Sequence, residues 1–390
     1  MDMIDNFDLR QLVEPLQNWF KGNARVLPWR ENPLGYYVWI SEIMLQQTRV
    51  EAVKPYFDRF IKELPDVKAL AECPEDKLLK LWEGLGYYNR VRNLKIAANQ
   101  IMEEYGGVIP SDYEELLKLK GIGHYTAGAI ASIAYGKAVP AVDGNVLRVI
   151  SRVTADDSDI MKQSVRNHIE NCLYNIMNDV QDVGIQVFYG KSMRLEPAVF
   201  NQALMELGAT VCVPNGAPRC EVCPWNEMCE ARKQNRIAEL PVKKKAKERR
   251  IEEKTVLIIK DGERLALHKR PAKGLLAGLY ELPNVSGYKT ETEIIEYIKE
   301  NGYSPIRIQP VCEAKHVFSH VEWHMKGYVV FLQAKEYENE PIQECKKVEA
   351  TQHWIFVDVE ETKEKYAIPS AFVKYTEYLN LVIGKDAIVS

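Results

Sequence analysis

Hydrophobic positions recur at helical spacing through the first 230 residues of the chain. Segments 76–85, 92–105 and 113–119 show this period most clearly, and glycine, proline, asparagine and aspartate separate them. This half has no convincing strand-like alternation. We therefore expect it to be all-α.

The pattern changes near residue 253. Segments 255–259, 265–269 and 327–332 are runs of β-branched or aromatic residues, and Asp261-Gly262 is typical of a hairpin turn. Segment 292–301 has the pattern of one helix. We expect a smaller α+β domain in this half.

A basic, weakly apolar stretch separates the two halves. Its cations are Lys243, Lys244, Lys245, Lys247, Arg249 and Arg250. A solvated linker is the favoured interpretation, and a weak contact with phosphates is the alternative. The predicted organisation is a helical domain at 1–231, a linker at 232–252 and an α+β domain at 253–390.

Composition is typical of a globular protein. Of the 390 residues, 46% are hydrophobic and 27% charged, which suits two or three domains. The net charge of -4 does not indicate nucleic-acid binding, although a groove needs only local positive charge. No apolar run is long enough to cross a bilayer, and residues 1–20 lack a signal-peptide core. We expect a cytoplasmic protein that binds no membrane.

Four of the eight cysteines crowd into one short loop. Seven residues separate Cys212 from Cys220, two separate Cys220 from Cys223, and five separate Cys223 from Cys229. Short loops of this kind let four thiolates converge on one centre, and zinc and a four-iron, four-sulfur cluster both accept that arrangement. The spacing predicts a metal or cluster site without deciding between the two.

Two glycines punctuate the segment 116–133. Gly121 and Gly123 flank Ile122, with one helix expected to end at Lys120 and another to begin near Tyr125. The free amides at the start of the second helix could cradle a phosphate. An ordinary helix–turn–helix corner is the competing interpretation.

Two carboxylates are candidates for chemistry. Asp143 precedes an apolar helix, where a helix N-cap is the plainer role. Glu42 lies in segment 37–50, where a continuous helix would place Glu42, Gln46 and Arg49 on one face. A solvent-facing stripe is the plainer interpretation there, although the nearby Trp29 and Arg30 favour a site.

Taken together, several segments resemble the adenine glycosylase (MutY) family of the endonuclease III-like helix-hairpin-helix superfamily. The matching pieces are LPWR at 27–30, SEIMLQQT at 41–48, LGYY at 85–88, GIGHYTA at 121–127, VDGNVLR at 142–148, NQALMELG at 201–208, the cysteine loop, GLLAGLYELP at 274–283 and HVFSH at 316–320. They occur in the family's order over more than half the chain.

The resemblance implies removal of adenine mispaired with 8-oxoguanine in double-stranded DNA. Glu42 would be a protonated acid that donates to adenine N7 and later activates water. Asp143 would be the ionised nucleophile or stabiliser of the sugar cation. Asn145 would support Asp143, and Tyr125 would line the site.

The resemblance also assigns binding roles. Residues expected near the adenine are Arg25, Trp29, Arg30, Tyr87 and Gln202. Those expected to contact DNA are Gln46 and Gln47 at the wedge that fills the gap left by the extruded base, with Gly121, Gly123 and Thr126 in the hairpin. The cysteines would hold a four-iron, four-sulfur (4Fe-4S) cluster, in a monomeric, nucleoid-associated protein of bacterial type.

The second half resembles a Nudix fold. Phe318, Ser319 and His320 match the loop that reads 8-oxoguanine, whereas a hairpin tip with a buried phenylalanine is the plainer interpretation. Glu291, Glu293, Glu296 and Glu300 lack the pattern of a working Nudix box, so we expect no phosphohydrolase activity.

Three features depart from the family pattern. The first cysteine gap holds seven residues where six is usual, Lys120 replaces a proline, and segment 180–195 is longer than usual.

Two other functions stay open at this point. A bifunctional glycosylase/lyase would need a hairpin lysine where this chain has Tyr125, and Lys120 lies on the other side of the glycines. A non-enzymatic DNA-binding protein built on a zinc loop is the alternative from a different class.

Overall fold

The structure is a computed structural model, which describes residues 2–182, 186–188, 191–193, 195–244, 248–333 and 354–379, with side chains undescribed from 180 to 194. The chain divides into two compact units. The first comprises Met1–Glu72 and Asn93–Ala246, and the second comprises Cys73–Arg92 and Lys247–Ser390. None of the described helices is both long and apolar enough to span a membrane.

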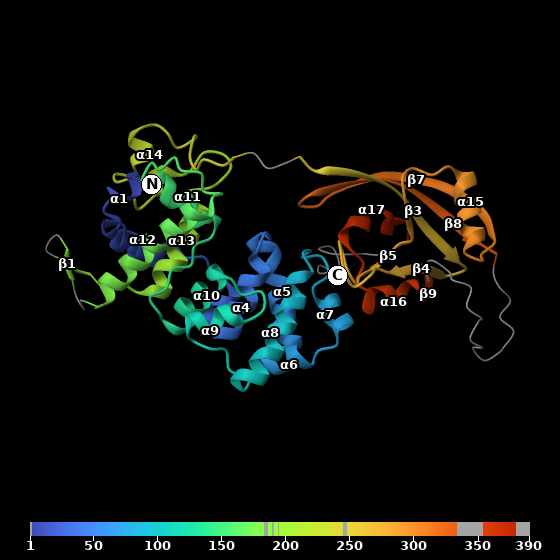
Figure 1. Ribbon diagram of the computed structural model, residues 1–390, viewed down its shortest axis with the longest axis horizontal. Coiled ribbons are helices and arrows are strands. Elements are labelled where there is room, and N and C mark those ends of the chain that lie inside the picture. Colours follow the sequence, from blue (N-terminus) through green and yellow to red (C-terminus); the bar gives the residue numbers. More distant parts are fainter. Residues whose placement is uncertain are drawn as a thin grey trace. The chain divides into compact units, whose positions relative to one another are not determined.

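The first unit is built mainly of helices (Figure 1). Its elements are α1 (Asp2–Asp5), η1 (Leu9–Leu12), α2 (Val13–Asn23), α3 (Pro28–Glu31), α4 (Gly35–Leu45), α5 (Val50–Glu63), α6 (Val67–Glu72), α8 (Asn89–Tyr105), α9 (Tyr113–Lys118), α10 (His124–Ala129), η2 (Ile130–Ala134), α11 (Gly144–Val153), α12 (Gln163–Asp182), α13 (Pro197–Thr210), η3 (Cys220–Val222) and α14 (Glu230–Lys233). The predicted helical fold is confirmed.

Two strands modify the all-α expectation. Strands β1 (Gln186–Phe188) and β2 (Lys191–Met193) pair antiparallel, with Val187 opposite Ser192. They fall inside segment 180–195, which is longer than in the family. A pair of three-residue strands is too short to produce a visible period in the sequence.

Helix α4 is enclosed on nearly every side. Eight of its eleven residues are buried, from Tyr36 through Met44. Such a helix is apolar all round and belongs to a core, not to a surface. The solvent-facing stripe considered for Glu42 is therefore wrong. The helix also ends at Leu45, so Gln46 and Arg49 do not share a helical face with Glu42.

The helix-hairpin-helix forms as the glycine spacing predicts. Helix α9 ends at Lys118, Gly121 has φ +80°, and Gly123 precedes α10. A side chain at Gly121 would come within 2.7 Å of Asn93 Cβ, so this position needs both the conformation and the smallness of glycine. Ile122 is buried and its N–H donates to Leu119 O, which closes the turn.

The second unit contains a seven-stranded mixed sheet (Figure 1). Its strands are β3 (Arg250–Asp261), β4 (Arg264–Lys269), β5 (Tyr280–Glu281), β6 (Asn284–Ser286), β7 (Pro305–Val317), β8 (Val321–Leu332) and β9 (Trp354–Asp358). The central order is β5-β4-β3-β8-β7, with β6 beside β3 and β9 beside β4. Strands β3 and β8 run parallel, and the remaining pairs are antiparallel. This is the expected α+β domain.

Helices cover both faces of this sheet. Val256 and Ile258 pack with Phe372 and Tyr375, near η4 (Ser370–Phe372) and α17 (Val373–Thr376). Leu257 and Ile259 face the other way, toward α15 (Glu291–Glu300). Burial on both faces explains why segment 255–259 is continuously apolar instead of alternating. The unit also contains α16 (Val359–Glu364) and η5 (Glu377–Leu379).

The observed division into units differs from the predicted one at residues 73–92. Residues 73–92, with α7 (Glu75–Leu81), group with the C-terminal sheet. The Glu83 carboxylate accepts from the Ile368 N–H at 2.7 Å, and Lys80 donates to Thr362 O and Tyr366 O. These long-range bonds have no periodic signature in the sequence.

The expected linker is also shorter than 232–252. Leu240 is buried, Arg152 donates to Leu240 O, and the Ile160 N–H donates to Val242 O. Strand β3 already begins at Arg250. Residues 245–247, with Lys245 and Lys247 of the basic stretch, lie outside the described residues.

Candidate active site

A cavity of about 650 Å³ lies within the first unit. Its walls come from α3, α4, α10, α11 and α13, elements that are far apart in the sequence. The lining residues predicted from the sequence are Arg25, Trp29, Arg30, Glu42, Gln46, Gln47, Tyr125, Asp143, Asn145 and Gln202. The volume is in the range of small-ligand sites and suits one nucleobase with its sugar.

Glu42 is a buried acid in this cavity. Its side chain projects from α4, and the residue is 5% exposed. Tyr125 Oη donates a very short hydrogen bond to Glu42 Oε2. Burial raises the pKa of Glu42 to about 7, although this bond and the charge of Arg30 act in the opposite direction. Glu42 can therefore hold a proton at neutral pH, the state that a general acid needs.

Asp143 is both the N-cap of α11 and a residue that lines the cavity. It is the N-cap of α11, where Oδ1 accepts from the N–H groups of Asn145 and Val146 at 2.8 Å each. Its Oδ2 accepts from Asn145 Nδ2 at 2.7 Å. The same carboxylate lines the cavity. Burial raises the pKa of Asp143, and these hydrogen bonds partly offset that effect. Burial therefore outweighs the hydrogen bonds in its effect on the pKa of Asp143.

Arg148 of α11 links the side chain of Asn145 to α13. Arg148 Nη2 donates to Asn145 Oδ1 at 2.9 Å and to Gly208 O at 2.8 Å. A side chain at Gly208 would come within 2.6 Å of Asn145 Cβ. The sequence analysis did not single out Arg148 or Gly208 for this role. An arginine inside an otherwise apolar helix was the available signal for Arg148.

A buried glutamate holds two arginines of the cavity, Arg25 and Arg30. Glu206 on α13 accepts from Arg25 Nε at 2.6 Å and from Arg30 Nη2 at 2.8 Å, and its side chain has no exposed surface. Burial alone would raise the pKa of Glu206, but these arginines outweigh it and lower the pKa. Glu206 was also missed. Its signal was a charged residue in the apolar segment 201–208.

The remaining cavity residues form its wall and rim. Trp29 is buried and packs edge-on against Phe57. Gln202 donates from its amide to Ala198 O within its own helix. Gln47, just beyond α4, has φ +59°, which is uncommon for a residue with a side chain and clusters at functional sites.

Two other predicted residues have different surroundings. Tyr87 belongs to the second unit, where Ser319 Oγ donates to Tyr87 Oη at 3.5 Å. Its backbone has φ +50°. The Thr126 side chain is enclosed, at 2% exposure for the residue, so only its backbone N–H can serve a ligand at the hairpin.

Phe318, Ser319 and His320 form the tip of the β7–β8 hairpin. The Phe318 N–H donates to Val321 O, and the Phe318 ring packs edge-on against Trp323 at 4.9 Å. Ser319 and His320 are exposed. This is a hairpin tip with a half-buried phenylalanine, which presents two polar side chains to solvent.

The four cysteines of the loop line one small cavity. Cys212, Cys220, Cys223 and Cys229 all carry free thiols, and they surround this cavity together with Arg152. Arg152 Nη1 donates to Cys212 Sγ at 3.3 Å. Burial, with a smaller contribution from the neighbouring sulfurs, raises the pKa of Cys223 to about 12. The loop therefore brings together the four sulfurs that the spacing predicted.

Comparison with known proteins agrees with this architecture. Residues 40–173 match the model of the HhH-GPD superfamily of base excision DNA repair proteins, and residues 255–378 match the NUDIX domain. The fold and site thus define a helix-hairpin-helix DNA glycosylase with a NUDIX-like second domain.

Comparison with individual relatives identifies the family within this class. The adenine DNA glycosylase of Mus musculus is 32% identical over 386 residues, which cover 84% of this chain and 72% of the relative. The adenine DNA glycosylase of Buchnera aphidicola subsp. Baizongia pistaciae is 32% identical over 323 residues, which cover 82% of this chain and 86% of the relative. The chain belongs to the adenine DNA glycosylase family. Among solved structures, a thermostable thymine-DNA glycosylase is 26% identical, with a TM-score of 0.47, over 58% of this chain and 97% of that one.

Proposed function

We propose that the protein hydrolyses the N-glycosidic bond of adenine mispaired with 8-oxoguanine in double-stranded DNA. The observation that carries the proposal is Glu42, a buried carboxyl with a pKa of about 7 that shares one cavity with Asp143. Two carboxyl groups in different environments are the usual equipment for cleaving a glycosidic bond through an oxocarbenium-like transition state.

Glu42 supplies the proton. Adenine is a poor leaving group as an anion, so protonation at N7 by Glu42 lowers the barrier. Asp143 faces the developing positive charge of the sugar and either stabilises it or bonds to it. Asn145 and Arg148 fix the orientation of Asp143 through the hydrogen bonds described above. Glu42, once deprotonated, accepts a proton from the attacking water.

The cavity receives the base only after it leaves the helix stack. Trp29 offers an aromatic wall, and Arg25, Arg30 and Gln202 surround the base. Gln46 and Gln47 at the end of α4 fill the gap in the duplex, and Gly121, Gly123 and the Thr126 amide hold a phosphate. Extrusion costs a few kcal/mol and is easiest at a mispair, which adds selectivity.

The second unit reads the opposite base. Ser319 and His320 are exposed polar side chains on a hairpin that Phe318 anchors. His320→Ala should reduce the preference for 8-oxoguanine over guanine more than it slows excision. The ratio of single-turnover rates on the two mispairs measures this effect, and an unchanged ratio would remove the assignment.

The cysteine loop fits a 4Fe-4S cluster. The donors are four free thiols, and Arg152 provides a hydrogen bond to one sulfur, which is typical of such clusters. Although all four cysteines are among the described residues, no three of their sulfurs lie within 4.8 Å of one another. A tetrahedral zinc site with 2.3 Å bonds requires sulfurs about 3.8 Å apart. The wider spacing favours a cluster, which would tie the loop to α11 and α13.

A residue of the hairpin predicts hydrolysis of the base without cleavage of the DNA strand. Tyr125 occupies the position where a lyase would need a lysine. With adenine opposite 8-oxoguanine, the protein should release adenine and leave the strand intact until alkali is added. Efficient trapping of an imine by borohydride would instead identify a lyase and overturn this part of the proposal.

The proposal as a whole is tested by substrate choice. Single-turnover assays on duplexes with adenine opposite 8-oxoguanine, guanine or thymine should show excision that is fastest with 8-oxoguanine and negligible with thymine. A duplex with an oxidised pyrimidine is assayed alongside, and faster release of that base than of adenine would reject adenine as the substrate.

A further inference from the structure

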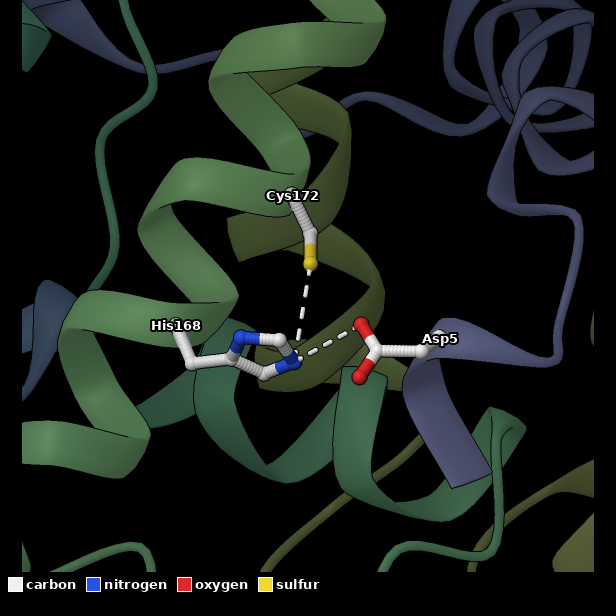
Figure 2. Close-up of side chains that lie close together, drawn as sticks. All are labelled: Asp5, His168 and Cys172. Atoms are coloured by element: carbon white, nitrogen blue, oxygen red, sulfur yellow. Dashed lines mark hydrogen bonds and ion pairs between the residues drawn. The ribbon is translucent and has the colours of Figure 1, made fainter. Parts of the chain in front are cut away.

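A third group of chemically reactive side chains lies outside both the cavity and the cysteine loop. Asp5 ends α1, and His168 and Cys172 lie one turn apart on α12 (Figure 2). Among the described residues these are the three metal-binding side chains whose ligand atoms all fall within 4.8 Å of one another. Neither the proposed reaction nor the cluster uses them.

The ligand atoms of these three side chains converge on one point. His168 Nε2 is 3.1 Å from Asp5 Oδ1 and 3.8 Å from Cys172 Sγ. A tetrahedral ion with bonds of 2.0–2.3 Å holds nitrogen and oxygen ligands about 3.3 Å apart, and nitrogen and sulfur ligands about 3.5 Å apart. The three side chains would need to move by only a few tenths of an ångström to bind one.

The same arrangement does not suit a catalytic triad. Figure 2 shows that both contacts end on the same ring nitrogen. A triad needs the acid on one ring nitrogen and the nucleophile on the other. An ion pair between Asp5 and His168 would explain one contact, but it leaves the approach of the sulfur unaccounted for.

The donor set selects the metal. One imidazole, one thiolate and one carboxylate suit zinc, whereas magnesium and calcium prefer oxygen ligands alone. A thiolate and a carboxylate together balance a divalent charge. The side chain of Asp5 is 56% exposed and that of His168 is 19% exposed, so a fourth position facing solvent is open to water.

We infer that Asp5, His168 and Cys172 form a zinc-binding site that ties the N-terminal turn to α12. Helix α1 has only four residues, and a helix this short is not stable alone. Its Ile4 already packs in the same core as Val165 and Ile169 of α12. The metal adds a polar link at the solvent edge of that contact.

Protection of Cys172 from alkylation tests the site residue by residue. The intact protein is treated with iodoacetamide in Zn²⁺ or in chelator, and the modified cysteines are quantified by mass spectrometry. Zinc should slow alkylation of Cys172 by about tenfold or more, because the bound thiolate is no longer the free nucleophile. Cys312, an exposed free cysteine of the second unit, is the internal control and should react equally in both conditions.

Variants separate metal binding from simple burial. In Asp5→Asn and His168→Gln, zinc should no longer protect Cys172. Asp8→Asn is the matched control, since Asp8 is a nearby exposed acid that pairs with Arg10, and protection should persist in it. The exposed position of Asp5 means that Asp5→Asn folds even if His168→Gln does not.

Metal counting completes the test. Equilibrium dialysis against Zn²⁺, with iron measured in the same samples, should give one zinc per chain that is lost in Cys172→Ala and kept in Cys312→Ala, at equal iron content. Equal zinc binding by wild type and Cys172→Ala, or unprotected Cys172 in wild type, would overturn the inference.

Discussion

At the scale of single residues, the site depends on how two carboxyl groups differ. Glu42 accepts a hydrogen bond from Tyr125 and projects from a largely buried helix. Asp143 accepts three hydrogen bonds from the first turn of α11. Burial raises the pKa of both carboxyl groups, but the three donors partly offset this effect for Asp143. The ionised form of Asp143 therefore has more hydrogen-bond support than that of Glu42.

The pKa of Glu42 predicts how excision depends on pH. Because the protonated form is the active one, the single-turnover rate should be level below pH 7 and fall about tenfold per unit above it. Tyr125 donates to the carboxylate and so favours its ionised form. Tyr125→Phe should therefore raise the pKa of Glu42 and move the falling limb to higher pH. A limb that stays in place or moves to lower pH would contradict this assignment.

Glu206 gives a second prediction at this scale. Glu206→Gln replaces a buried charge that pairs with Arg25 and Arg30, and it should lower the free energy of unfolding by about 3 kcal/mol at pH 7. The folded-state pKa of Glu206 lies below its ordinary value of 4.5. The stabilisation by the Glu206 carboxylate is thus fully present above pH 4.5, and it is lost as the pH falls through the folded-state pKa.

Denaturant unfolding at several pH values measures this effect. The difference between wild type and Glu206→Gln should shrink in acid. A difference that is constant with pH would mean that the charge of Glu206 contributes nothing to stability.

At the scale of elements, the contact between α11 and α13 sets the position of Asp143. Gly208→Ala would press a methyl group against Asn145, 2.6 Å from its Cβ, and displace the side chain that orients Asp143. We expect a loss of about 1–3 kcal/mol in stability and a slower single-turnover rate with little change in DNA affinity.

The control is Gly22→Ala, at an exposed position of α2, where the added methyl group meets no atom within 4 Å. That variant should be as active as wild type and slightly more stable. Normal excision by Gly208→Ala would show that the two helices can separate without moving Asp143.

The same scale shows what the sequence can and cannot predict. The hairpin with Gly121 and Gly123 was predictable because positive φ and close approach leave a local signature. Strand β7 was missed because its positions are mostly exposed or half-buried and show no clean alternation. The end of α4 at Leu45 was missed because residues 46–50 contain no glycine or proline to mark a helix end. The grouping of Tyr87 with the C-terminal sheet was missed because long-range packing, not local pattern, decides its unit.

At the scale of the whole molecule, the two units are not divided by a single cut in the chain. Residues 73–92 depend on the C-terminal sheet through Glu83, whose carboxylate accepts from the buried Ile368 N–H and from Lys80. Removal of the second domain would take away one partner of the Glu83 carboxylate, the Ile368 N–H. A fragment that ends near residue 246 would lack this bond.

Glu83→Ala tests this dependence within the full chain. An unsatisfied buried amide costs about 1–3 kcal/mol, so the variant should unfold at a lower temperature, and segment 73–92 should be cut faster by protease. Glu360→Ala removes an exposed pair with Lys363 and is the control, with an expected change near zero. Equal protease resistance of Glu83→Ala and wild type would show that the segment is held by other contacts.

The central claim is that Glu42 and Asp143 act from two helices on one extruded adenine nucleotide. The most direct measurement is single-turnover excision on an adenine:8-oxoguanine duplex by wild type, Glu42→Gln and Asp143→Asn, with DNA affinity measured on the same samples. The account predicts that both variants bind the duplex as wild type does and release almost no adenine. Wild-type release by either variant would contradict it.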